Sequence, residues 1–102
     1  PLVRADGTVV HLPSAAFAVE VTATWTSPDT GAVYPAGWHI TIPQESLVID
    51  LEPTVAAQEL DTRATTGVIY WEGSQRVSAS RAGVALGGEA YVELTGYAPC
   101  SC

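Results

Sequence analysis

The chain has 102 residues, a length that suits one domain with one hydrophobic core. A hydrophobic content of 47% and a mean hydropathy of +0.20 exclude an intrinsically disordered chain, and no apolar run approaches the roughly 18 residues of a membrane-spanning segment. The net charge of −7, with four scattered bases (Arg4, Arg63, Arg76 and Arg81), excludes the basic footprint that binding to nucleic acid or to an anionic membrane requires.

Further expectations come from residue types that the chain lacks and from two cysteines near its C-terminus. Because the chain has no Met, we expect a processed form or one domain of a longer protein. Without Asn it has no N-glycosylation site. Cys100 and Cys102 lie too close together for a relaxed disulfide within one chain, so a frayed tail is expected, with metal binding or an intermolecular bridge as alternatives.

Hydrophobic residues recur every second position through most of the chain, which predicts β-strands. The clearest example covers residues 17–26, where Phe17, Val19, Val21 and Trp25 share one face and threonines share the other. The same period predicts further strands, in chain order, at residues 7–13, 38–42, 47–52, 68–72, 75–80 and 90–97. Residues 54–60 are predicted to be a strand or a bridging segment, because Pro53 ends the strand before them.

Turn signals separate these predicted strands. The sequence SPDTG at residues 27–31 is typical of a type I turn followed by a glycine in the left-handed region. RATTG at 63–67 and LGG at 86–88 mark further breaks, and GSQ at 73–75 suggests a tight hairpin. The spacing predicts an all-β fold, an antiparallel meander of roughly seven to nine strands, as a barrel or a sandwich.

Several kinds of active site are excluded by the residues present. A Walker-type phosphate loop needs Lys, and the chain has none. The Gly-x-Ser-x-Gly nucleophile motif is also missing. His11 and His39 have no third ligand at metal-binding spacing, so we expect no metal site, and no spacing selects a Ser-His-Asp triad.

The pattern Tyr-x-Glu occurs twice inside predicted strands, as Tyr70 with Glu72 and as Tyr91 with Glu93. If this face lines a cavity, burial raises the pKa of a carboxyl group and lets it act as an acid or base. Glu72 and Glu93 are therefore the candidate catalytic residues. The alternative places both glutamates on a solvated or partner-facing surface, with Arg76 or Arg81 as a cationic partner.

Three tryptophans and one histidine are further candidates for a ligand site. Trp25, Trp38 and Trp71 are expected to form a shared core cluster or the wall of an apolar pocket. His39 falls on the face of its strand opposite Trp38, which is typical of a surface residue, with a ligand-facing role as the alternative. Together with Tyr70 and Tyr91, these residues make up the predicted ligand-binding set.

Four motifs in order give the chain a family resemblance: WTSPDTGAVYPAGWHITIP, then QEL, then YWEG, then YVELTGY. This series resembles the C-terminal half of the lipocalin-like AttH/CrtC superfamily, which includes predicted secreted hydrolases and carotenoid 1,2-hydratases. The resemblance covers about residues 7–97. It implies a lipocalin-like β-barrel that is one half of a two-barrel protein, with an N-terminal half as partner domain.

The resemblance also implies a function. Characterised members act on large apolar molecules without a metal or organic cofactor, so an apolar, polyene-like or terpenoid-like ligand is expected. A periplasmic or secreted location is suggested by the resemblance alone. We therefore expect a domain that binds an apolar small molecule. One alternative is a hydratase or pericyclase in which Glu72 or Glu93 protonates a polyene, and the other is a structural half-barrel that packs on a partner domain.

Overall fold

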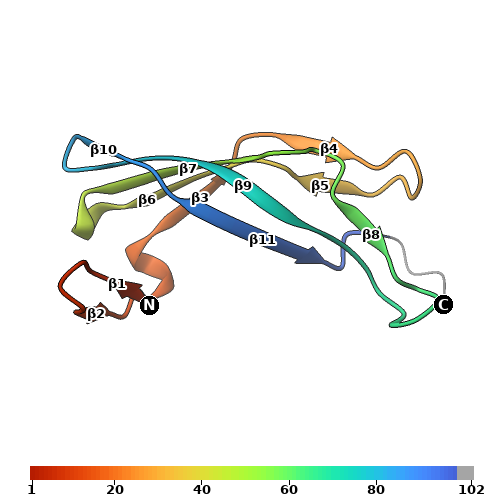
Figure 1. Cartoon of the computed structure of the whole chain (residues 1–102), viewed down its shortest axis with the longest axis horizontal. Helices are drawn as coiled ribbons and strands as arrows, with labels where there is room; N and C mark the ends of the chain where they lie inside the picture. The colour runs from red at the N-terminus through yellow and green to blue at the C-terminus, as the bar shows by residue number, and fades with distance from the viewer. Residues whose placement is uncertain (99–102) are drawn as a thin grey trace.

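The computed structural model describes residues 1–98, and these form a curled antiparallel β-sheet with no α-helix among them (Figure 1). Cys100 and Cys102 lie outside the described residues. The strands are β1 (Leu2–Val3), β2 (Val9–Val10), β3 (Ala18–Val21), β4 (Thr24–Thr26), β5 (Val33–Pro35), β6 (Trp38–Ile42), β7 (Leu47–Pro53), β8 (Glu59–Asp61), β9 (Ile69–Arg81), β10 (Val84–Leu86) and β11 (Glu89–Thr95). Two single-turn 3₁₀ helices, η1 (Ser14–Ala16) and η2 (Pro43–Glu45), complete the elements.

The main sheet has seven strands, and β9 is its longest member. One edge of β9 pairs with β7 and β8, and the other edge pairs with β10 and β11. Strands β6 and β3 extend the sheet beyond β7. Every pairing is antiparallel, and this confirms the predicted all-β meander. Within the described chain, β3 and β10–β11 remain unpaired edges, so the curled sheet is a half-barrel.

Short strands in this sheet are pieces of longer ones. The register of β3 with β6 continues unchanged into the pairing of β4 with β5, because hydrogen bonds from Thr22 N to Gly37 O and from Ala36 N to Ala23 O bridge the gap. A side chain at Gly37 would place its Cβ 2.6 Å from Thr22 Oγ1, so glycine allows this close approach. The long hairpin thus places β4 and β5 at the end of the molecule where β8 lies (Figure 1).

The predicted hairpin at residues 73–75 is wrong, because β9 runs straight through it. Trp71, Gly73, Gln75 and Val77 alternate inward without interruption, so the period of two continues across the glycine. The predicted bridging segment is present at residues 54–58, between the end of β7 at Pro53 and the start of β8. The Trp71 indole Nε1–H donates to Ala56 O at 2.9 Å and holds this segment against the sheet.

The two faces of the sheet differ in character. Trp38 pairs with Leu51, and Leu51 pairs with Val77, so one row of side chains across three strands is apolar. On the opposite face, His39 pairs with Asp50, and Asp50 with Ser78. We call the first the inner face and the second the outer face. The core lies on the inner face and comprises Ala32, Tyr34, Ala36, Trp38 and Trp71.

Candidate functional site

Tyr34 is the centre of an aromatic cluster on the inner face, and its side chain is fully buried. Its ring centroid lies 6.1 Å from that of Trp25, 6.5 Å from Trp71 and 5.6 Å from Tyr97. Trp38 meets Trp71 edge-on at 6.0 Å. Strands β4, β5, β6 and β9 each contribute one ring, and the segment after β11 contributes the fifth. Such pairs stabilise a core beyond their buried area, so this cluster joins the hairpin to the sheet.

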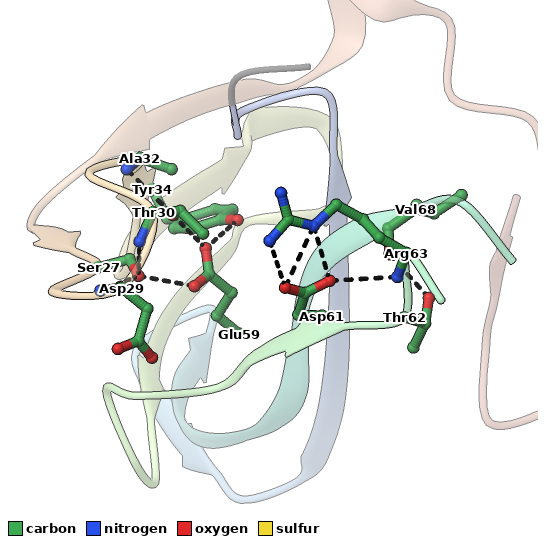
Figure 2. A network of polar contacts seen from close by, with 10 residues as sticks. All are labelled: Ser27, Asp29, Thr30, Ala32, Tyr34, Glu59, Asp61, Thr62, Arg63 and Val68. Atoms are coloured by element: carbon green, nitrogen blue, oxygen red, sulfur yellow. Dashed lines mark hydrogen bonds and ion pairs between the residues drawn. The ribbon is translucent and has the colours of Figure 1, made fainter. Parts of the chain in front are cut away.

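Glu59 on β8 accepts three hydrogen bonds from the β4–β5 hairpin (Figure 2). Ser27 Oγ donates to Oε1 at 2.6 Å, while Thr30 Oγ1 and the Tyr34 hydroxyl donate to Oε2 at 2.8 and 2.7 Å. Ser27 Oγ in turn accepts the backbone N–H groups of Asp29 and Thr30 at 3.1 Å. One carboxylate therefore fixes both the turn at the hairpin tip and the ring beneath it.

These contacts decide the charge state of Glu59. Burial raises the pKa of its carboxyl group, but the hydrogen bonds from Ser27, Tyr34 and Thr30 outweigh burial and leave the pKa below its usual value. Burial and the neighbouring carboxylate raise the pKa of Tyr34, so its hydroxyl stays protonated. At neutral pH the pair consists of an anionic acceptor and a neutral donor. This arrangement suits a fixed structural contact. An ionised Glu59 has no proton to donate, so it does not suit a role as a general acid.

Asp61 and Arg63 form an exposed ion pair beside this network (Figure 2). Arg63 Nη2 donates to Asp61 Oδ2 at 2.7 Å, and Arg63 Nε donates to Oδ1 at 3.0 Å. The bonds from Arg63 lower the pKa of Asp61. The pair connects two residues of the loop after β8. Because both side chains are exposed, it contributes little to global stability.

An apolar row crosses the inner face next to the aromatic cluster, against which its member Ile40 packs. Its members are cross-strand neighbours on five strands, namely Val19, Ile40, Ile49, Ala79 and Leu86. The outermost two are open to solvent, with Val19 54% and Leu86 44% exposed. Val21, which also points to the inner face, is 49% exposed. The inner face is thus a filled core at one end and an open apolar surface at the other.

The structure divides the predicted ligand-binding residues between the two faces. Trp25, Trp38 and Trp71 lie together on the inner face, as the predicted shared cluster. By strand alternation, His39, Tyr70 and Tyr91 lie on the outer face. His39 Nδ1 contacts Asp50 Oδ1 at 2.6 Å, and this hydrogen bond raises the pKa of His39. Because the two groups lie on opposite faces of the sheet, they do not form one site.

The two candidate catalytic residues, Glu72 and Glu93, are direct cross-strand neighbours on the outer face. Their charges and burial raise the pKa of the adjacent Tyr91, with burial as the larger cause. The arginines expected beside them have other partners: Arg76 Nη1 lies 3.6 Å from Glu52 Oε2, and Arg81 Nη2 lies 2.9 Å from Glu45 Oε1. The Arg81 expectation fails because Arg81 points to the inner side, next to the η2 turn.

The buried carboxylate of Glu45 in η2 was not anticipated from the sequence. Its Oε1 accepts from Arg4 Nε at 3.0 Å and from Arg81 Nη2 at 2.9 Å, while its Oε2 accepts from Arg4 Nη2 at 2.8 Å. The bonds from Arg4 lower the pKa of Glu45. This clamp ties the β1–β2 hairpin to the η2 turn and to the end of β9.

Sequence reasoning also missed Glu59 and Tyr34, although a signal was available. Ser27, Thr30 and Tyr34 lie in the first of the four motifs, and Glu59 is the middle residue of the second. Trp71 belongs to YWEG, and Tyr97 ends YVELTGY. All four motifs therefore meet around Tyr34, which explains why they occur together.

No group of three or more His, Cys, Asp or Glu side chains in residues 1–98 is arranged to hold a metal ion. The same residues contain no helix of the length and hydrophobicity needed to cross a membrane.

Comparison with known proteins agrees with this architecture. A family model described as AttH-like matches residues 1–97. The crystal structure of a candidate AttH protein from Nitrosomonas europaea is similar to this chain, with a TM-score of 0.76 and 33% sequence identity. The match covers 94% of this chain and 28% of the Nitrosomonas chain, so this chain spans little more than a quarter of that protein's length. No curated protein matches the chain.

Proposed function

The chain belongs to the AttH-like family, and from this premise we propose that the open end of its inner face binds a large apolar small molecule. The observation that carries the proposal is the apolar row from Val19 to Leu86, which is exposed at both ends beside a rigid aromatic cluster. A concave apolar surface on a stable sheet is the usual setting of a small-molecule site. A polyene or terpenoid has the length and hydrophobicity to cover several strands of this row.

Binding through this face assigns different roles to the aromatic residues. Trp71 and Tyr34 are fully buried in the core on the same inner face, so they pack beside the apolar row and are closed to a ligand. Trp25 and Trp38 lie in or against the same cluster, so a ligand nearby would quench tryptophan fluorescence. His39, Tyr70 and Tyr91 would contact only a ligand that reaches the outer face.

The experiment is a titration of the chain with retinol, followed by tryptophan fluorescence. We expect saturable quenching, weakened at least tenfold by Val19→Glu, because a carboxylate in the apolar row would have to be desolvated. Ala18→Glu is the matched control, since Ala18 lies on the same exposed strand but faces outward. Equal effects of the two variants, or no quenching by a chain shown to be folded, would overturn the proposal.

A second candidate function draws on the same open face. In a longer AttH-like protein, another lipocalin-like half would cover the apolar row and the unpaired edge β3. The 28% coverage of the Nitrosomonas chain supports the existence of such a partner domain. In that case a stable complex with the partner would abolish retinol binding, and Val19→Glu would weaken the complex.

The enzyme alternative remains a prediction about Glu72 and Glu93. It requires a polyene to reach the outer face, where the two carboxylates face each other. Glu72→Gln and Glu93→Gln would then abolish turnover without unfolding the chain. Retention of turnover in both variants would exclude these residues as the acid.

A further inference from the structure

Strand β11 lies at one border of the main sheet, and only one of its two edges is paired. Its residues Glu89–Thr95 pair with residues 70–76 of β9 and with no other strand of the described chain. In an antiparallel sheet, alternate residues of an edge strand direct their backbone N–H and C=O groups away from the neighbouring strand. No hydrogen bond from residues 1–98 reaches that side of β11. The strand therefore presents a row of backbone donors and acceptors to a further strand.

The residues of β11 do little to protect this edge. Edge strands that resist pairing contain Pro, Lys, a β-bulge or a charge on the core side. The sequence EAYVELT has no Pro or Lys, its register with β9 is continuous, and both of its glutamates point to the outer face. On the inner face, Val92 and Leu94 are only partly buried and pack against the core cluster. An added strand would extend this apolar face and cover the exposed part of both side chains.

The charges beside β11 indicate which kind of strand fits. Glu93 lies directly opposite Glu72, and neither has a cation within salt-bridge distance among residues 1–98. Glu89 lies opposite Arg76, whose Nη1 is 3.6 Å from Glu52 Oε2. Like charges at a direct cross-strand position destabilise a sheet. A Lys or Arg on an added strand next to Glu93 would offset this repulsion.

The same charges oppose pairing with a second copy of the chain. Two β11 strands side by side would bring Glu89 and Glu93 of both copies onto one face, next to Glu72. The net charge of −7 on each chain adds to this repulsion. Charge complementarity therefore selects against the chain itself and in favour of a basic partner.

We infer that the unpaired edge of β11 binds an extended protein strand in which Lys or Arg residues alternate with apolar residues. The apolar residues of that strand continue the inner face beyond Val92 and Leu94, and its basic residues lie beside Glu89 and Glu93 on the outer face. Backbone hydrogen bonds supply affinity in this mode of binding, and the alternating side chains supply specificity. The inference does not depend on ligand binding at the apolar row.

The test titrates the isotope-labelled chain with a seven-residue peptide of alternating Val and Lys, which matches the length of β11. Its ends are acetylated and amidated, so that only the Lys side chains carry charge. We expect saturable changes in the amide NMR signals of residues 89–95, and weaker binding as salt screens the ion pairs. A control peptide with the same residues in two blocks should bind roughly tenfold more weakly, because its pattern does not match the two faces of a strand.

Variants of the chain test the contribution of charge. Glu93→Gln should weaken binding of the alternating peptide roughly two- to fivefold at low salt, as the loss of one exposed ion pair predicts. Glu20→Gln is the matched control and should leave the affinity unchanged. Glu20 also points to the outer face, but it lies on β3, the edge strand at the opposite border of the sheet.

Modified peptides test the contribution of the backbone. Two further alternating peptides carry methyl groups on the backbone nitrogens of every second residue, one on the Val residues and the other on the Lys residues. Only one of these sets of N–H groups faces β11 in an added strand, because successive residues direct their N–H groups to opposite edges. We therefore expect one methylated peptide to lose binding and the other to retain it.

Several outcomes would overturn the inference. Equal affinities for the alternating and block peptides would show that net charge alone accounts for binding. Equal effects of Glu93→Gln and Glu20→Gln, or signal changes confined to β3, would exclude β11 as the site. Equal binding of the two methylated peptides, or no binding of the alternating peptide to the folded chain, would exclude strand addition. Should Glu93→Gln not fold, the peptides compared on the unmodified chain still decide the inference.

Discussion

The Tyr34 hydroxyl donates a hydrogen bond of 2.7 Å to the Glu59 carboxylate, across 25 residues of sequence. Tyr34→Phe keeps the stacked ring and removes only this bond. We expect it to lower the free energy of unfolding by roughly 1–3 kcal/mol, because the bond involves a charged acceptor that is partly buried. Urea denaturation measures the change.

Tyr97→Phe is the control for this change. The ring of Tyr97 meets that of Tyr34 at an angle of 42°, but its hydroxyl has no partner within the part of the chain that the structure describes. We expect it to change stability by less than about 0.5 kcal/mol. Equal losses from the two substitutions would show that the Tyr34–Glu59 bond contributes nothing specific.

Ionisation of Glu59 should make the free energy of unfolding depend on pH in the acid range. Its folded-state pKa lies below the usual value of 4.5, so at pH values near and below 4.5 the unfolded chain binds more protons at this position. The contribution of Glu59 is therefore complete well above pH 4.5 and is lost as the pH falls through the folded-state pKa.

Comparison with Glu59→Gln isolates this contribution. The free energies of unfolding of the two proteins should differ most at pH 7 and converge toward pH 3. Glu45 and Asp61 also have lowered pKa values, so both proteins will lose stability in acid. A difference that stays constant from pH 7 to pH 3 would contradict an ionised Glu59.

The facing glutamates on the outer face predict a stabilising substitution. Glu72 and Glu93 are direct cross-strand neighbours, and like charges in that position repel. Glu93→Gln should raise the free energy of unfolding by roughly 0.2–1 kcal/mol, with a larger gain at low salt. Glu89→Gln, on the same strand but opposite Arg76, should give no gain. A loss of stability from Glu93→Gln would indicate a favourable partner for that carboxylate.

The clamp around Glu45 predicts local loosening of the N-terminal hairpin. Glu45→Gln removes the negative charge between Arg4 and Arg81, so the two guanidinium groups would repel each other. We expect a lower melting temperature and faster amide hydrogen exchange at Val9 and Val10. Glu52→Gln, in an exposed pair with Arg76, should change neither measurement appreciably. Unchanged exchange in Glu45→Gln would show that other contacts hold the hairpin.

The sequence was a good guide to the faces of individual strands. Alternation placed Val19, Val21 and Trp25 on one face, and their cross-strand neighbours Ile40, Trp38 and Tyr34 are apolar as well. This pattern is local, because each residue's face depends only on its position along its own strand. The fold class and the meander follow from it.

Contacts between segments far apart in the sequence could not be predicted from strand alternation. Glu59 meets Ser27 and Thr30 across 32 and 29 residues, and a period of two does not specify which side chains will meet across such separations. The wrong hairpin at residues 73–75 has a related cause. The sequence predicts a turn at Gly73, whereas in the structure this glycine makes space for the side chain of Gln58 from another segment.

The meander has a consequence for the order of folding. Three of the six pairings in the main sheet join strands that are consecutive along the chain, and the β3–β6 pairing continues into the β4–β5 hairpin. The hairpins β3–β6, β6–β7 and β9–β10 can therefore close one after another through short loops. Docking of Tyr34 onto Glu59, Trp71 and Tyr97 requires those hairpins to exist already. The aromatic cluster is then a late event: it does little to speed folding, and its contacts act mainly by slowing escape from the native state.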